Sequence, residues 1–207
     1  GYRNRFTCMR KRIPWRPGRG FNSKETRILA PQTATVVGPE GHDGIHTDEY
    51  GRVRVQFHWD RDGTMDERSS AWLRVAGAWA GAELGAAAAP RVGSEVLVQW
   101  LDGNPDRPII TGNVSNAGNM PPWSVPAQRS LTGLRSRELG TDMGNVPGGR
   151  GNHLILDDTN GGIQAQLKSD HECSQLSLGH IARVEDTGGR KDTRGEGWEL
   201  ATNAWGV

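Results

Sequence analysis

Residues 52–60 alternate between apolar and polar side chains almost without interruption. The apolar parity holds Val53, Val55, Phe57 and Trp59, and the polar parity holds Arg52, Arg54, Gln56, His58 and Asp60. Because successive side chains of a strand point to opposite faces, this pattern predicts a half-buried β-strand with a polar outer face. Such a face could bind nucleic acid, form a metal or catalytic site, or meet water or another subunit.

Four further short segments have strand character and are separated by turn-forming residues. They are residues 34–38, 71–76, 93–101 and 109–114. Trp59 and Trp100 share a parity with aliphatic residues, so both are predicted to be buried. The alanine run 86–89 is too short for a stable helix and ends at Pro90. Five short strands without an amphipathic helix predict an all-β fold, and the five-stranded Greek-key barrel known as the OB-fold fits best.

The chain beyond Asn116 differs in character. A proline-rich connector leads into three strand-like runs at residues 152–158, 162–169 and 174–181. Hydrophobic residues make up only 34% of the chain, which also holds 29 glycines, so each run has little apolar surface to bury. Strands this short and polar cannot stabilise themselves within one chain. We therefore expect them to be either disordered or completed by neighbouring copies.

Charge is distributed unevenly along the chain. Residues 1–30 carry nine Lys/Arg and one Glu, a local charge of +8 in a chain whose total is +1. This segment is best interpreted as a solvated or partner-facing linker, with phosphate contact as the alternative. Cys8 and Cys173 match no disulfide framework and indicate a reducing compartment. The start shows no signal peptide, no apolar run is long enough to span a bilayer, and we expect both ends to be cuts within a longer protein.

The most conspicuous polar cluster lies in the loop before residue 52. It consists of His42, Asp43, His46, Asp48 and Glu49, with His58 and Asp60 further along the chain. Histidine and carboxylate side chains are common metal ligands, so a metal-dependent hydrolase is one functional hypothesis. However, nearby glycines place the histidines in a loop, the H-E-x-x-H order is missing, and spacing fixes no third ligand. A surface loop is therefore the favoured interpretation.

Other residues of catalytic type occur in ordinary turn or strand contexts. Ser69 and Ser70 precede a strand, whereas His171 and Cys173 would share a face if they lay on one, without a neighbour to orient the imidazole as a base. The adjacent carboxylates are Asp157 with Asp158 and Glu185 with Asp186. Neither pair follows the order of a calcium loop, and phosphate-binding glycine motifs and a G-x-S-x-G elbow are missing. We therefore assign no catalytic, cofactor-binding or metal-binding residue.

Single-stranded nucleic acid is the main alternative ligand, because OB barrels bind it with basic residues and aromatic platforms. The chain has eight tryptophans, but Trp59 and Trp100 are predicted to be buried. Residues 32–117 also hold seven Lys/Arg against twelve Asp/Glu, a net charge of −5. That charge disfavours a polyanionic ligand.

Three long strings carry a resemblance to a known family. They are IHTDEYGRVRVQFHWDRDG, PRVGSEVLVQWLDGNPDRPIITGNVSNAGNMPP and NHLILDDTNGGIQAQLKSDHECSQLSLGHI. These strings resemble the VgrG family, the valine-glycine repeat spike proteins of bacterial type VI secretion, which are similar to the central spike of contractile phage tails. The resemblance extends from Tyr2 to Gly206.

The resemblance implies three regions and a structural role without catalysis. Residues 1–31 are expected to be the end of a hub domain and its linker, residues 32–117 the OB-fold barrel, and residues 118–207 a connector and the start of a trimeric β-helical needle. It implies a homotrimer that sits on the secretion tube protein and carries a tip protein and effector cargo. It implies no cofactor and no nucleic-acid partner, and membrane contact only by mechanical penetration. Assembly would occur in the cytoplasm, followed by translocation into a target cell.

The resemblance also changes the interpretation of residues 52–60. Their polar side chains are then expected to form the outer surface of a barrel that faces water, a loop or neighbouring protomers. In this interpretation a substitution there disturbs assembly before it disturbs any chemistry.

Overall fold

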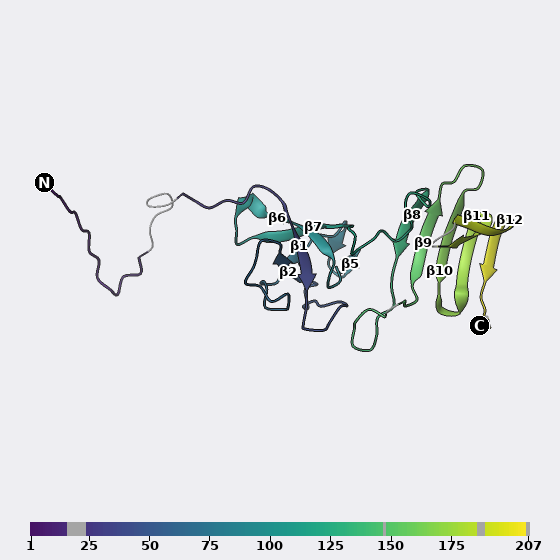
Figure 1. Cartoon of the computed structure of the whole chain (residues 1–207), viewed down its shortest axis with the longest axis horizontal. Helices are drawn as coiled ribbons and strands as arrows, with labels where there is room; N and C mark the ends of the chain where they lie inside the picture. Colours follow the sequence, from purple (N-terminus) through teal and green to yellow (C-terminus); the bar gives the residue numbers. More distant parts are fainter. Residues whose placement is uncertain (16–23, 147, 186–188, 206–207) are drawn as a thin grey trace.

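The computed structural model describes residues 1–15, 24–146, 148–185 and 189–205. The chain forms two successive five-stranded β-sheets and a two-stranded hairpin (Figure 1). The strands are β1 (Gln32–Val37), β2 (Arg54–Phe57), β3 (Arg74–Val75), β4 (Ala80–Gly81), β5 (Leu84–Gly85), β6 (Glu95–Trp100), β7 (Pro108–Val114), β8 (Leu131–Arg135), β9 (Asn152–Asp157), β10 (Gln164–Ser169), β11 (Ser174–Glu185) and β12 (Gly189–Ala201). Two 3-10 turns, η1 (Leu101–Gly103) and η2 (His171–Cys173), complete the elements. The predicted all-β class is confirmed.

The first sheet closes into a barrel. Its strand order is β2-β1-β6-β7-β3, so β2 and β3 lie at its two edges. The edges meet through a bridge in which Val53 N donates to Leu73 O at 3.0 Å and Leu73 N donates to Val53 O at 2.8 Å. Closure removes the open edges that would otherwise pair with another chain. The predicted five-stranded OB barrel is thereby confirmed.

The barrel core is small and aliphatic, as the alternating pattern predicts. Its fully buried residues come from every main strand or its flank: Ala34, Val36, Val53, Val55, Leu73, Val96, Val98 and Ile110. Branched side chains suit this position because they pack well on a pleated surface. Truncating Ile110 to alanine would cost about 2–5 kcal/mol of stability.

Of the two tryptophans predicted to be buried, one is exposed and the other is half-buried. Trp59 is 67% exposed, so the prediction of its burial is wrong. The chain leaves β2 at Phe57 and turns, with Asp60 N donating to Phe57 O at 3.1 Å, and strand alternation no longer applies beyond that point. Trp100 is half-buried against the core and stacks on Phe57 with ring centroids 5.7 Å apart.

The excursion between the third and fourth predicted strands contains the short hairpin β4 and β5. The alanine run 86–89 is exposed and has no helical turn, as its length predicts. The predicted strand at residues 71–76 is reduced to the two residues of β3 plus the Leu73 bridge. No helix among the described residues has the length and apolar character needed to span a bilayer.

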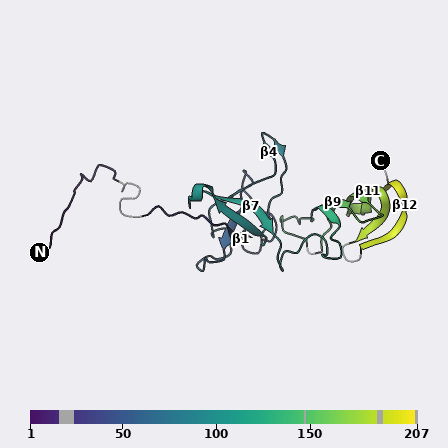
Figure 2. The same cartoon turned by 90° about the horizontal axis from the view of Figure 1, so that it is seen from above.

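The second sheet is an antiparallel meander in the order β12-β11-β10-β9-β8. Seen from above, β11 and β12 curve round the end of the sheet (Figure 2). The three predicted runs form β9, β10 and β11, so the alternative that they are disordered is wrong. The sequence patterns predicted neither β8 nor β12.

Candidate assembly interface

One face of the second sheet carries a row of leucines that crosses every strand. Leu154 on β9 lies opposite Leu167 on β10, which lies opposite Leu176 on β11. Leu134 on β8 and Leu200 on β12 extend the row at its two ends. Directly opposed side chains on one face are close enough to pack. The register therefore assembles a continuous apolar line from residues far apart in sequence.

A second row lies two residues along each strand, and therefore on the same face. It consists of Thr132, Leu156, Ala165, Leu178 and Trp198. The leucines of the two rows are between 38% and 75% exposed, and Trp198 is 73% exposed. We call these two rows the leucine face. An exposed apolar patch that spans a whole sheet marks an interaction surface.

The opposite face of the same sheet buries polar side chains. Gln164, Gln166 and Ser177 are at most 2% exposed. Gln166 Nε2 donates to Ser177 Oγ at 3.1 Å, and Gln164 Nε2 donates to Ala182 O at 2.9 Å. Since Ala182 lies on the part of β11 beyond its pairing with β10, the Gln164 bond holds the curved end of the sheet over its polar face.

His153 completes this polar network. Its Nε2 lies 2.8 Å from Gln166 Oε1, and an amide oxygen can only accept, so the ring donates from Nε2. Burial lowers the pKa of His153 although the bond to Gln166 opposes the shift, which favours the neutral ring. Hydrogen-bonded amides thus fill the interior of the sheet while its leucines point outward.

The histidines of the polar loop do not converge on one point. His42 Nε2 lies 3.2 Å from Ile45 O, and His46 lies against the Trp72 ring at 5.1 Å. His58 lies 3.7 Å from Glu95 at the start of β6, one strand beyond β1 in the same sheet. Burial, and then the neighbouring His42 and Arg54, lower the pKa of His46. Within the described residues, no group of three His, Cys, Asp or Glu is placed to hold a metal.

The carboxylates of that region have local structural partners. Asp48 pairs with Arg52 at 2.6 Å, and Asp60 Oδ1 accepts from the amides of Asp62 and Gly63. Asp43 Oδ1 accepts from Asn145 N at 2.9 Å, a contact that spans from the barrel to the second sheet. Glu49 is exposed.

The remaining residues of catalytic type are also separated. His171 and Cys173 lie in η2 rather than on a strand, so they do not share a strand face, and His171 contacts Arg150 at 2.9 Å. Asp157 is buried and accepts from Ser130 and Thr159, whereas Asp158 is exposed. Glu185 ends β11, and Asp186 lies outside the described residues.

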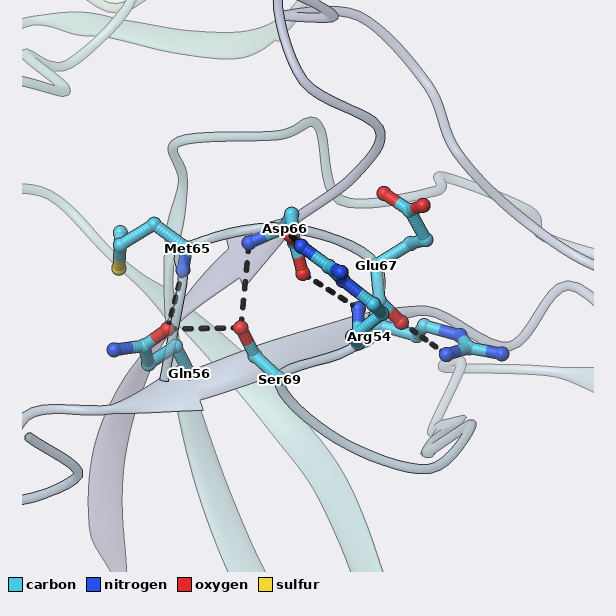
Figure 3. Close-up of polar contacts among 7 residues, drawn as sticks. Arg54, Gln56, Met65, Asp66, Glu67 and Ser69 are labelled. Atoms are coloured by element: carbon cyan, nitrogen blue, oxygen red, sulfur yellow. Dashed lines mark hydrogen bonds and ion pairs between the residues drawn. The ribbon is translucent and has the colours of Figure 1, made fainter. Parts of the chain in front are cut away.

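The polar face of β2 is covered by the loop that follows it (Figure 3). Gln56 is only 7% exposed, and its Oε1 accepts from Met65 N at 2.7 Å and from Ser69 Oγ at 2.8 Å. Arg54 donates to the carbonyl of Glu67 and stacks over Trp72, 4.5 Å from the ring centroid. Of the three predicted surroundings for this face, a loop covers Arg54 and Gln56.

The same loop is stabilised by contacts between Asp66 and Arg68. Hydrogen bonds from the Arg68 side chain and backbone hold the pKa of Asp66 well below its usual range. The Arg68 Nη2 to Asp66 Oδ2 distance is 2.5 Å. Ser70 Oγ accepts from Val55 N at 3.0 Å, so both serines, Ser69 and Ser70, anchor the loop to β2.

Comparison with known proteins matches both sheets to one kind of machinery. Residues 33–114 match the family model of the type VI secretion system/phage-baseplate injector OB domain. Residues 144–207 match the model of the type VI secretion system Rhs element Vgr. Two type VI secretion system spike proteins of Pseudomonas aeruginosa, VgrG2a and VgrG2b, each share 46% sequence identity with this chain over 94% of its length. A third, VgrG4b, shares 40% identity over 93% of its length. The chain belongs to the VgrG family.

The chain spans about a fifth of the length of the curated VgrG relatives it matches, with shares of 22%, 18% and 23%. The resemblance expected from the sequence strings is confirmed. The leucine face lies on strands β8 to β12, and all but β8 fall within the segment matched to the VgrG model. No feature of a single strand would have identified this face, because it depends on the register of five strands.

Proposed function

We propose that this chain is a structural part of a homotrimeric type VI secretion spike and has no catalysis of its own. The observation that carries the proposal is the leucine face. Its apolar rows lie outward on the protomer, and association of copies would remove them from water. Under this proposal residues 118–207 begin the β-helical needle, residues 32–117 form the barrel domain, and residues 1–31 lead in from a hub domain.

A spike that works by shape must transmit force between its parts. The barrel is joined to the second sheet by hydrogen bonds in addition to the covalent connector. Asn145 N donates to Asp43 Oδ1 at 2.9 Å, and Arg91 Nη2 donates to Arg137 O at 2.6 Å. Ile45 N donates to Met143 O at 3.3 Å. We call this set of contacts the clasp. It supports a rigid junction between barrel and needle.

The spike would sit on the secretion tube protein and carry a tip protein and effector cargo. It would assemble in the cytoplasm, be driven out by contraction, and cross target membranes by mechanical penetration. No cofactor is required for such a role. These partners and stages are proposals for the full-length protein that contains this chain.

The experiment is sedimentation of that full-length protein over a range of concentrations. A species of three times the protomer mass supports the proposal. A stable monomer at micromolar concentration would contradict it.

Single-strand binding by the barrel is a second candidate, because one observation favours it. Trp59 is exposed and stacks on Phe57 at 5.3 Å with an angle of 14° between the rings, as an aromatic platform would. The charge of −5 over residues 32–117 opposes it. Anisotropy of a labelled oligothymidine at low salt decides the matter, since phosphate contacts must weaken steeply as salt rises.

A further inference from the structure

A cavity of about 1060 Å³ lies between the barrel and the second sheet. One wall is formed by the segment before β6, which includes Arg91 and Val92. A second wall is the connector around Met120 and Pro121, and a third is the end of β8 around Arg137. The cavity therefore forms only when the clasp holds the two sheets together.

The lining of this cavity is positively charged. Among the described residues, three arginines, Arg91, Arg135 and Arg137, line it with a single carboxylate, Asp43. Arg91 and Arg135 are held in place by carbonyl groups, because Arg91 Nη2 donates to Arg137 O and Arg135 Nη1 donates to Pro122 O at 3.1 Å. Burial, and then the charge of Arg137, lower the pKa of Arg91. The cavity thus has two more positive than negative charges, and an anionic group would relieve their repulsion.

The strand that borders the cavity has an open edge. β8 is the last strand of its sheet and faces the barrel (Figure 1), and within the described part of the chain it pairs with β9 alone. Its ladder continues past Arg135, since Ser136 N donates to Asn152 O and Glu138 N donates to Arg150 O. In an antiparallel pair, residues that bond to the partner strand alternate with residues whose backbone N–H and C=O groups point away from that partner. That places the backbone groups of residues 133 and 135 where an added strand would bind.

We propose that this cavity binds an extended, carboxylate-bearing peptide segment of a partner protein, which pairs with the β8 edge and places its acidic side chains against the arginines. Addition of a strand to an open edge is a common mode of peptide recognition, in which backbone bonds supply affinity and side chains supply specificity. Arg135 and Arg137 are two residues apart, which matches acidic residues two apart on an extended peptide. Met120, Pro121 and Val92 offer apolar contacts for its remaining side chains.

A nucleic acid fits the same arginines less well. The barrel that forms one wall has a net charge of −5 over residues 32–117, so a long polyanion is repelled outside the cavity. A short peptide confines its carboxylates to the positive lining. The inference rests on the proposed spike role only for the identity of the partner as cargo or tip.

The test uses the full-length protein and a rhodamine-labelled peptide of four Glu-Thr repeats, with four Gln-Thr repeats as the uncharged control. We expect anisotropy to detect binding of the acidic peptide alone. Arg137→Glu should raise its dissociation constant about tenfold or more. Arg61→Glu, an equal charge change at an exposed residue outside the cavity lining, should leave it within twofold.

Four outcomes would overturn the inference. They are equal losses in the two variants, equal binding of both peptides, stronger binding of an oligothymidine than of the acidic peptide, or a loss of trimer by Arg137→Glu in a protein that binds no peptide. The last result would place a second copy in the cavity. Sedimentation of the same samples separates the two proposals, because a monomer that still binds the peptide contradicts the trimer alone.

Discussion

Replacing Leu167 by threonine should weaken association of the spike without unfolding the protomer. Leu167 occupies the middle strand of the leucine face and is 56% exposed in the single chain. Full burial of a leucine is worth about 1.5–3 kcal/mol, so covering the exposed half on association contributes about 1–1.5 kcal/mol per protomer. Threonine keeps a high strand propensity, which limits the effect on the sheet itself.

Three copies lose this contribution together when the protein is a trimer. The sum is about 3–4.5 kcal/mol, which corresponds to a change of about two to three orders of magnitude in the association constant. Sedimentation equilibrium of the full-length protein measures this constant directly. Leu84→Thr is the matched control, because Leu84 is 55% exposed on the short hairpin of the barrel. Equal association constants for the two variants would refute the assignment of the leucine face.

Three further predictions concern the barrel, its junction with the second sheet, and the second sheet itself. Gly44→Ala should break the clasp, because an added Cβ would lie 1.7 Å from the Met143 carbonyl oxygen; hydrogen exchange of residues 139–146 should rise, and Gly112→Ala, which meets no atom within 4 Å, should change nothing. Gln56→Ala should cost about 1–3 kcal/mol, since it leaves the Met65 amide and Ser69 hydroxyl without their acceptor; thermal unfolding against the exposed control Gln99→Ala measures this, and equal melting temperatures would contradict the buried role of Gln56. Asp170→Asn should lower stability at neutral pH and have less effect in acid, because bonds from Gly151 N and Lys168 lower the pKa of Asp170 against the opposing effect of burial. A carboxylate with a lowered pKa stabilises the fold above its unfolded value of 3.8, and this contribution is lost as pH falls through the lower folded value; a pH-independent difference between the two proteins would reject this role.

Much of the barrel was predictable because its information is local. Alternation in residues 52–60 and 93–101 identifies two strands, and the turn formers at residues 101–108 set the connection to the strand that follows. The errors occur where the chain leaves the sheet. Trp59 continues the parity of β2, but the turn after Phe57 ends the strand. No glycine or proline near Phe57 indicates where the strand ends.

The missed strands depend on partners rather than on their own residues. β12 begins with a run of charged residues and glycines, yet it pairs along β11 through Leu200, Trp198 and Gly197. β8 contains Gly133, where an added Cβ would lie 1.9 Å from the Leu154 carbonyl oxygen. The glycine looks like a break in the sequence, but close approach of β9 requires it.

The leucine face shows why the proposed interface could not be predicted from any one segment. In β9 the leucines Leu154 and Leu156 suggest the core parity, yet the protomer buries Ile155 and Asp157 instead. Buried polar groups are stable only when they are hydrogen-bonded, and the glutamine network of β10 meets that condition without help from another chain. The polar side of the sheet is therefore complete within one protomer, while its apolar side lacks a covering layer. A sheet with this asymmetry gains more from association than from further folding, which is the property that the proposed homotrimer requires.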